Sequence, residues 1–122
     1  MDRILRGLRG ATTATANTSA AILEATDELL RALQTANGFQ PEDIESAIFT
    51  SSPDLTAEYP ARAARRLGWH DVPLLGACEV PVPGGLPHCI RVLLHFYTAK
   101  PPRELKHMYL RGAAKLRPDR AG

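Results

Sequence analysis

The clearest alternation of apolar and polar positions along the chain lies between residues 88 and 98. One face of the strand predicted there is entirely apolar and consists of Ile90, Val92, Leu94 and Phe96. This pattern is typical of a strand covered on one side by helices. The opposite face carries Cys89, Arg91, Leu93, His95 and Tyr97. Arg91 is therefore expected in mid-strand on a largely apolar face, where it needs a partner because an unpaired buried charge is costly.

Apolar residues at helical spacing predict two helices. In the first, Asn17 or Thr18 can serve as the N-cap and Asn37-Gly38 ends the helix. Its buried face is predicted to consist of Ile22, Ala25, Leu29, Leu33 and Ala36. The second helix is predicted to begin at Pro60 and to run to Leu67, where Gly68 ends it.

Four shorter strands are predicted at residues 4–11, 46–51, 72–80 and 107–111. Proline-led turns at 40–43 and 101–104 and a proline-rich loop at 81–87 separate these elements. The resulting order is strand, helix, strand, helix, strand, strand, strand. This order predicts an α+β fold in which a mixed β-sheet has its helices on one face.

Length and composition restrict the class of protein. A chain of 122 residues predicts one domain over 1–122, and a domain of this size would have to share a large site with another subunit. Hydrophobic residues at 44% and charged residues at 23% are ordinary for a globular protein. The apolar runs are too short to cross a membrane, and the first residues lack the apolar stretch of a signal peptide, so a cytoplasmic protein is expected.

The residues that commonly bind metals show no ligand pattern. The spacing of Cys78 and Cys89 matches neither a zinc site nor a disulfide framework, and both are expected to be small buried residues. The four histidines do not pair at helical spacing. No metal is predicted.

The types of basic residue are more informative about a possible ligand than the net charge is. A net charge of +2 is too small to indicate nucleic-acid binding. Of the 15 basic residues 12 are arginine, whose planar fork suits a small dianionic ligand. For most of these arginines, however, a GC-rich or heat-adapted genome is the better explanation. Arg62, Arg65 and Arg66 would form one basic helix face, which is either merely solvated or functional.

No sequence pattern supports covalent catalysis. The chain has no nucleophile elbow and no standard glycine-rich phosphate loop. What remains is the carboxylate of Glu79 at the end of one strand, with Arg9, Arg91 and Tyr109 on others. Glu79 and Arg91 could form a structural ion pair or part of a ligand site, and the pattern leaves both interpretations open.

Short motifs in a fixed order resemble the monofunctional chorismate mutases of the trimeric, pseudo-α/β-barrel class. They are RGLRGATT at 6–13, SPDL at 52–55, YPARA at 59–63, GGL at 84–86, CIRV at 89–92, YL at 109–110 and LRPD at 116–119. The resemblance spans essentially the whole chain. It implies a ferredoxin-like, chorismate-mutase-like subunit that forms a homotrimer with active sites between subunits, without metal or cofactor.

The activity that the resemblance implies is that of an isomerase, which converts chorismate to prephenate in phenylalanine and tyrosine biosynthesis. This Claisen rearrangement needs electrostatic preorganisation rather than covalent or acid–base catalysis. The alternative is a non-catalytic trimeric module that binds a small dicarboxylate metabolite. Glu79 speaks against that alternative, because a carboxylate among the arginines would weaken binding of a simple dianion. A third interpretation is a structural subunit with Glu79 and Arg91 as an internal ion pair.

The resemblance also implies which residues form the site. Arg91, Glu79 and Arg9 would be catalytic, and they would bind substrate together with Tyr109 of the same subunit. The neighbouring subunit would contribute Tyr59, Arg62, Arg65, Leu75 and Gly76. A C-terminal tail at about 112–122, with Leu116 and Arg117, would fold over the cleft. Gly76 is a departure, because members of the family can carry a cysteine at this position.

Overall fold

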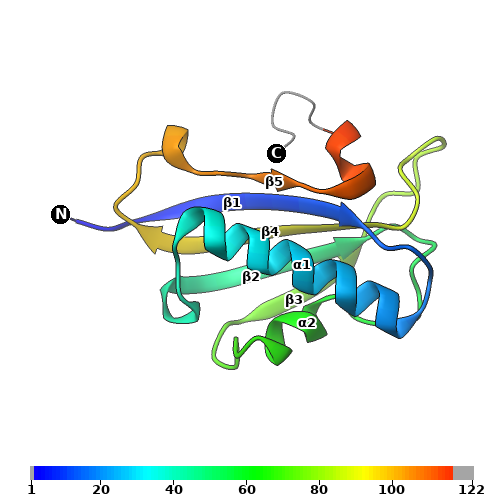
Figure 1. The fold of residues 1–122 in the computed structure, drawn as a ribbon, viewed down its shortest axis with the longest axis horizontal. Coiled ribbons are helices and arrows are strands. Elements are labelled where there is room, and N and C mark those ends of the chain that lie inside the picture. The colour runs from blue at the N-terminus through cyan, green and yellow to red at the C-terminus, as the bar shows by residue number, and fades with distance from the viewer. Residues whose placement is uncertain (1, 117–122) are drawn as a thin grey trace.

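The computed structural model describes residues 2–116, which form one mixed five-stranded sheet and two helices (Figure 1). The strands and helices in chain order are β1 (Ile4–Thr13), α1 (Ser19–Asn37), β2 (Ile44–Ser51), α2 (Ala61–Arg66), β3 (Leu74–Cys78), β4 (Cys89–Thr98) and β5 (Met108–Tyr109). Short 3-10 helices cover Pro41–Asp43, Pro102–Glu104 and Arg111–Lys115.

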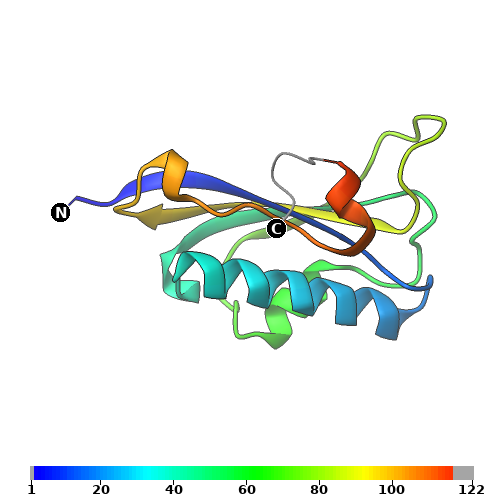
Figure 2. The same cartoon turned by 45° about the horizontal axis from the view of Figure 1, so that its top comes forward.

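The sheet has the strand order β3-β2-β4-β1-β5. The central strand β4 is antiparallel to both β1 and β2, whereas β3 is parallel to β2 and β5 is parallel to β1. Both helices lie on the same side of the sheet (Figure 2). The predicted α+β fold, with a mixed sheet and helices on one face, is confirmed.

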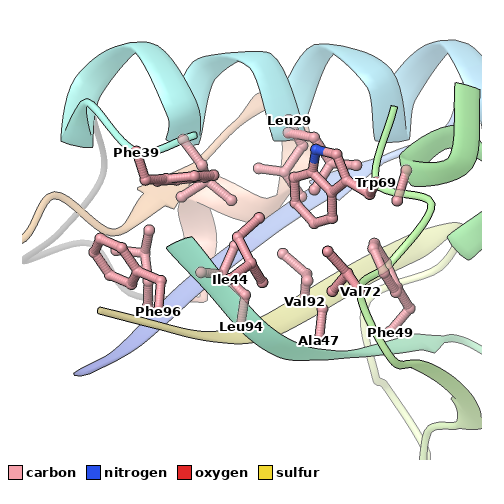
Figure 3. Close-up of a cluster of buried hydrophobic side chains, with 14 of the residues drawn as sticks. Leu29, Phe39, Ile44, Ala47, Phe49, Trp69, Val72, Val92, Leu94 and Phe96 are labelled. Carbon is pink, nitrogen blue, oxygen red and sulfur yellow. The ribbon is translucent and has the colours of Figure 1, made fainter. Parts of the chain in front are cut away.

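The core lies between the sheet and the helices. The predicted apolar face of β4 is buried, with no side chain among Ile90, Val92, Leu94 and Phe96 more than 3% exposed. Phe39 and Trp69 close the core, with ring centroids 6.3 Å apart and inclined at 72° (Figure 3). Gly10 is required in β1 because a Cβ there would lie 2.8 Å from Cδ1 of Leu33 on α1.

The ends of both helices follow the predicted signals. The Thr18 hydroxyl accepts a hydrogen bond from the main-chain N–H of Ala21 at 3.1 Å, as an N-cap does. Gly38 takes a left-handed conformation with φ 72° and donates its N–H to the carbonyl of Gln34. Helix α2 follows Pro60, and Gly68 after it also has a positive φ of 92°.

Several predicted boundaries were wrong. The first strand continues to Thr13, so Arg9 lies in its middle, while the strands predicted at 72–80 and 107–111 shrink to Leu74–Cys78 and Met108–Tyr109. Cys89 is buried as expected, but Cys78 is exposed, because β3 is an edge strand that the helices do not cover at this position. Within residues 2–116, no helix is long and apolar enough to cross a membrane.

The side of the sheet opposite the helices remains uncovered in the single chain. Its large apolar side chains lie on residues that alternate with the helix-facing positions of β1, β3 and β4, and four of them are 36% to 62% exposed: Leu5, Leu75, Leu93 and Tyr97. We call this side the open face. An apolar surface of this kind is typical of an interface.

Candidate active site

A pocket of about 430 Å³ opens on the open face and gathers residues from β1, β2, β4, β5 and the end of β3. Five of the predicted site residues line it: Arg9, Glu79, Arg91, Tyr109 and Leu116. They lie far apart in the sequence, between positions 9 and 116. Strand pairing brings Arg9, Arg91 and Tyr109 together, whereas Glu79 directly follows β3 and Leu116 follows the 3-10 helix after β5. Arg117 lies outside the described residues.

The pairing register explains why a hollow forms around Arg91. Ala11 of β1 and Thr50 of β2 are its direct partners across the sheet, and Tyr109 of β5 is the partner of Ala11. Partners in register on one face have neighbouring side chains. Arg91 therefore extends between two small side chains, with the phenol ring beyond one of them. Arg9 lies one row away, opposite Leu93.

The side chains of Glu79 and Arg91 lie close together but do not form a hydrogen bond with each other. Arg91 Nε lies 3.7 Å from Glu79 Oε2, well beyond the 2.7–2.9 Å of a tight ionic hydrogen bond. The side chains are 49% and 31% exposed, so the expectation of a buried arginine was wrong. Oε2 itself is buried and has no hydrogen-bond partner among the described residues. A structural ion pair would satisfy both groups, so this geometry favours a ligand site.

Cys89 lies on the same face of β4 as Arg91, two residues earlier. Burial raises the pKa of its thiol, while the neighbouring Arg91 acts in the opposite direction. Ser52 holds the main chain at this point: its N–H donates to the carbonyl of Cys89 and its hydroxyl accepts from the N–H of Cys89, both at 2.9 Å. A neutral thiol therefore lies beside the guanidinium without competing for its charge.

Asp54 ties the loop between β3 and β4 to the end of β2. Its carboxylate accepts the main-chain N–H of His88 at 3.0 and 3.2 Å and the hydroxyl of Ser52. The Ser52 hydrogen bond is the main cause that lowers the pKa of Asp54, and the His88 N–H adds to it. This loop begins at Glu79 and, together with Arg91, borders a second pocket of about 460 Å³. Asp54 thus holds one wall of the site.

The other predicted site residues lie apart from the first pocket. Tyr59 and Gly76 line a separate pocket of about 550 Å³, together with Cys78, on the side of β3 that faces away from Glu79. A Cβ at Gly76 would meet nothing within 4 Å, so the missing side chain leaves open space. Leu75 is on the open face of the same strand.

Glu58 organises the segment that carries Tyr59 and Arg62. Its carboxylate accepts the hydroxyl of Ser19 at 2.7 Å, the N–H of Tyr59 at 3.0 Å and the guanidinium of Arg62 at 2.8 Å. The Ser19 and Tyr59 hydrogen bonds lower the pKa of Glu58. Arg65 follows on the exposed surface of α2. We call Tyr59, Arg62, Arg65, Leu75 and Gly76 the second group. Within one chain, none of them lines the first pocket with Glu79 and Arg91.

The segment after β5 is anchored to β1 and α1. The guanidinium of Arg111 donates to both carboxylate oxygens of Glu28, at 3.1 and 3.4 Å, and to the carbonyl of Thr13 at 3.2 Å. The N–H of Gly112 donates to the Thr13 hydroxyl at 3.2 Å. Leu116 then packs beside Tyr109 and lines the first pocket.

Three residues of the site were not found from the sequence as site residues. Thr50 and Cys89 have the signal of strand alternation: Thr50 shares the face of Arg91 across the β2–β4 pairing, and Cys89 shares it two residues earlier on β4 itself. Asp54 lies in the quoted SPDL motif, but its role depends on contact with a loop more than thirty residues away.

The fold and the pocket together define an α+β protein with a pocket lined by two arginines, one carboxylate and one phenol. The family described as chorismate mutase type I matches residues 5–120, and the chain belongs to this family. It is 51% identical over 117 residues to the chorismate mutase AroH of Thermus thermophilus, covering 95% of this chain and 96% of that protein.

Two further comparisons agree. The chain is 41% identical over 117 residues to the chorismate mutase AroH of Bacillus subtilis (strain 168), covering 95% of this chain and 92% of that protein. The solved structure of a chorismate mutase from Clostridium thermocellum superposes with a TM-score of 0.89 at 44% identity, covering 90% of this chain and 98% of that one.

Proposed function

We propose that this protein is a chorismate mutase, an isomerase that rearranges chorismate to prephenate in the biosynthesis of phenylalanine and tyrosine. Besides family membership, one observation carries the proposal: Arg91 and Glu79 meet at 3.7 Å in an open pocket with neither charge fully satisfied by the other. A non-catalytic binding module for a dicarboxylate has no use for the carboxylate of Glu79 at this place.

The rearrangement of chorismate requires little from the protein beyond charged groups in fixed positions. The reaction is a Claisen rearrangement within one molecule, so it needs no nucleophile and no proton transfer. In its transition state the carbon–oxygen bond is largely broken, which leaves the ether oxygen partly negative and the ring partly positive. Fixed charges aimed at these two regions stabilise the transition state more than the substrate.

Each of the five predicted site residues that line the first pocket has a proposed task. Arg91 donates to the ether oxygen and to the side-chain carboxylate of the substrate, since its side chain is half-exposed and lines the pocket. Glu79 accepts from the ring hydroxyl and faces the cationic ring. Arg9 and Tyr109 hold the side-chain carboxylate, which keeps the substrate in the compact conformation that reacts. Leu116 supplies apolar contact at the rim.

We infer a homotrimer in which the open faces of three sheets pack together. The exposed side chains of Leu5, Leu93 and Tyr97 need such a cover, and 122 residues form too small a domain to enclose the substrate alone. In this assembly the second group of one subunit completes the first pocket of the next. That group comprises Tyr59, Arg62, Arg65, Leu75 and Gly76. We expect the enzyme to be cytoplasmic.

The direct test adds purified protein to chorismate and follows the loss of ultraviolet absorbance, with prephenate confirmed by acid conversion to phenylpyruvate. Turnover by the parent and near loss of it in Arg91→Ala would support the proposal. Arg31→Ala is the matched control, because among residues 2–116 Arg31 pairs with Asp27 alone, on the surface of α1. An inactive parent whose melting temperature still rises with prephenate would instead support the binding module.

A further inference from the structure

Two buried side-chain oxygens at the first pocket have no hydrogen-bond partner among the described residues. One is Oε2 of Glu79 and the other is the hydroxyl oxygen of Thr50. Both residues line the pocket that contains Arg91. Buried polar atoms without partners are uncommon in folded proteins, so two of them in one pocket call for an explanation.

Thr50 is placed directly beside the charged pair. It is the partner of Arg91 across the β2–β4 ladder and of Ala77 across the β2–β3 ladder, on the open face. The N–H of Glu79 donates to the carbonyl of Ser51 at 2.9 Å, which fixes the backbone of Glu79 next to the end of β2. The hydroxyl of Thr50 and the carboxylate of Glu79 thus project from adjacent strands toward the same hollow.

The fold itself does not need this hydroxyl. Valine has the same branched shape as threonine and suits a strand equally well. An unpartnered buried hydroxyl lowers the stability of the folded chain relative to an apolar group of that shape. The hydroxyl is therefore explained by what it contacts when the site is occupied.

We propose that Thr50 is a positioning residue for Glu79, and this inference rests on the proposed function. When substrate is bound, the Thr50 hydroxyl donates a hydrogen bond to Oε2, which holds the other carboxylate oxygen toward the ring of the substrate. The Thr50 oxygen is itself buried beneath the pocket surface, so it acts through the carboxylate rather than on the substrate. No bond is made or broken and no proton is transferred in this role.

The test compares two threonines that each have a buried hydroxyl oxygen without a partner among the described residues. Thr12 also has a buried hydroxyl oxygen without a partner, but it is on β1, paired with Ile90 of the helix-covered face, and does not line the pocket. Both Thr50→Val and Thr12→Val should melt at or above the temperature of the parent. Only Thr50→Val should lose kcat, by about tenfold with KM changed less than twofold. Thr50→Ser retains the hydroxyl and should restore most of kcat.

A double-mutant cycle tests the route through Glu79. In a Glu79→Gln background, Thr50→Val should reduce kcat by clearly less than it does in the parent. Parent-like kcat in Thr50→Val, or an equal loss with and without the Glu79 carboxylate, would overturn the inference. A lower melting temperature with unchanged kcat would make the hydroxyl structural. If the parent itself does not convert chorismate, the proposed function fails, which is a different result from any of these.

Discussion

Nε of Arg91 lies 3.7 Å from Oε2 of Glu79, and both side chains are partly exposed although Oε2 itself is buried. The relationship has a structural origin, because the neighbours of Arg91 in register are Ala11 and Thr50, which are too small to cover it. An exposed pair at this distance contributes at most about 1 kcal/mol to stability. Its arrangement is therefore better explained by the ligand than by the fold.

From this relationship we expect Arg91→Ala to lower activity strongly while changing stability little. We expect kcat to fall by about 10² to 10³, as for loss of one donor to a developing oxyanion. The free energy of unfolding should change by less than about 1 kcal/mol, because the ion pair is half-exposed. Steady-state kinetics and chemical denaturation on the same samples measure both quantities.

Arg91→Lys serves as the companion variant. It should recover only a small part of the lost kcat, because an ammonium group cannot make the forked contact of a guanidinium. Full recovery would show that charge alone is sufficient at this position. Unchanged kinetics in Arg91→Ala would contradict the proposed mechanism, whereas Arg31→Ala should match the parent throughout.

Arg65 is predicted to act mainly on substrate capture. It is exposed on α2, so Arg65→Ala should raise KM and weaken the dependence of kcat/KM on salt, with a smaller change in kcat. Kinetics at several salt concentrations provide the measurement. A fall in kcat at unchanged KM would place Arg65 against the reacting part of the substrate instead.

The proposed sharing of sites between subunits predicts complementation in mixed trimers. Arg91→Ala damages the first pocket and Arg65→Ala damages the second group, which no single chain brings together. If the two variants are mixed equally, unfolded and refolded together, about one quarter of the sites receive two intact halves. At chorismate concentrations well below KM, where both variants are impaired, activity should then rise clearly above the mean of the two variants. Activity equal to that mean would mean that each chain has a self-contained site.

The local features of the sequence predicted the elements well. Thr18 and Gly38 specify the ends of α1 by their own side chain and backbone, and the alternation from Ile90 to Phe96 specifies the buried face of β4. Features that depend on pairing were not predictable in this way. The exposure of Cys78 follows from the edge position of β3, which is set by contact with β2 alone.

The site shows the same division. The carboxylate and arginines could be singled out because charged residues next to apolar strands are unusual. The exposure of Arg91 could not, since it depends on small partners contributed by β1 and β2. Thr50 was missed because a threonine in a strand is ordinary until its register and its unpartnered oxygen are known.

The anchor between Arg111 and Glu28 predicts a modest effect on substrate binding. Arg111→Ala removes the contacts to Glu28 and to the carbonyl of Thr13, so the segment that carries Leu116 should be held less firmly. We expect KM to rise by about threefold with little change in kcat, which is the scale of a partly exposed ion pair. In a Glu28→Gln background the same substitution should cost less, and equal costs would show that the pair is not the anchor.

Because the pKa of Asp54 is lowered in the folded protein, we expect stability to fall at acid pH. Its pKa is lowered from the ordinary value of 3.8 by the hydroxyl of Ser52 and the N–H of His88. A group whose pKa is lower in the folded state contributes stability above its unfolded pKa and loses that contribution as the pH falls through the folded value. The free energy of unfolding of the parent should therefore decline more steeply below about pH 4 than that of Asp54→Asn, which lacks the titrating group. Denaturant titrations at several pH values, with the exposed Asp2→Asn as control, measure the two slopes. Identical slopes for Asp54→Asn and the parent would mean that Asp54 does not hold the loop through its charge.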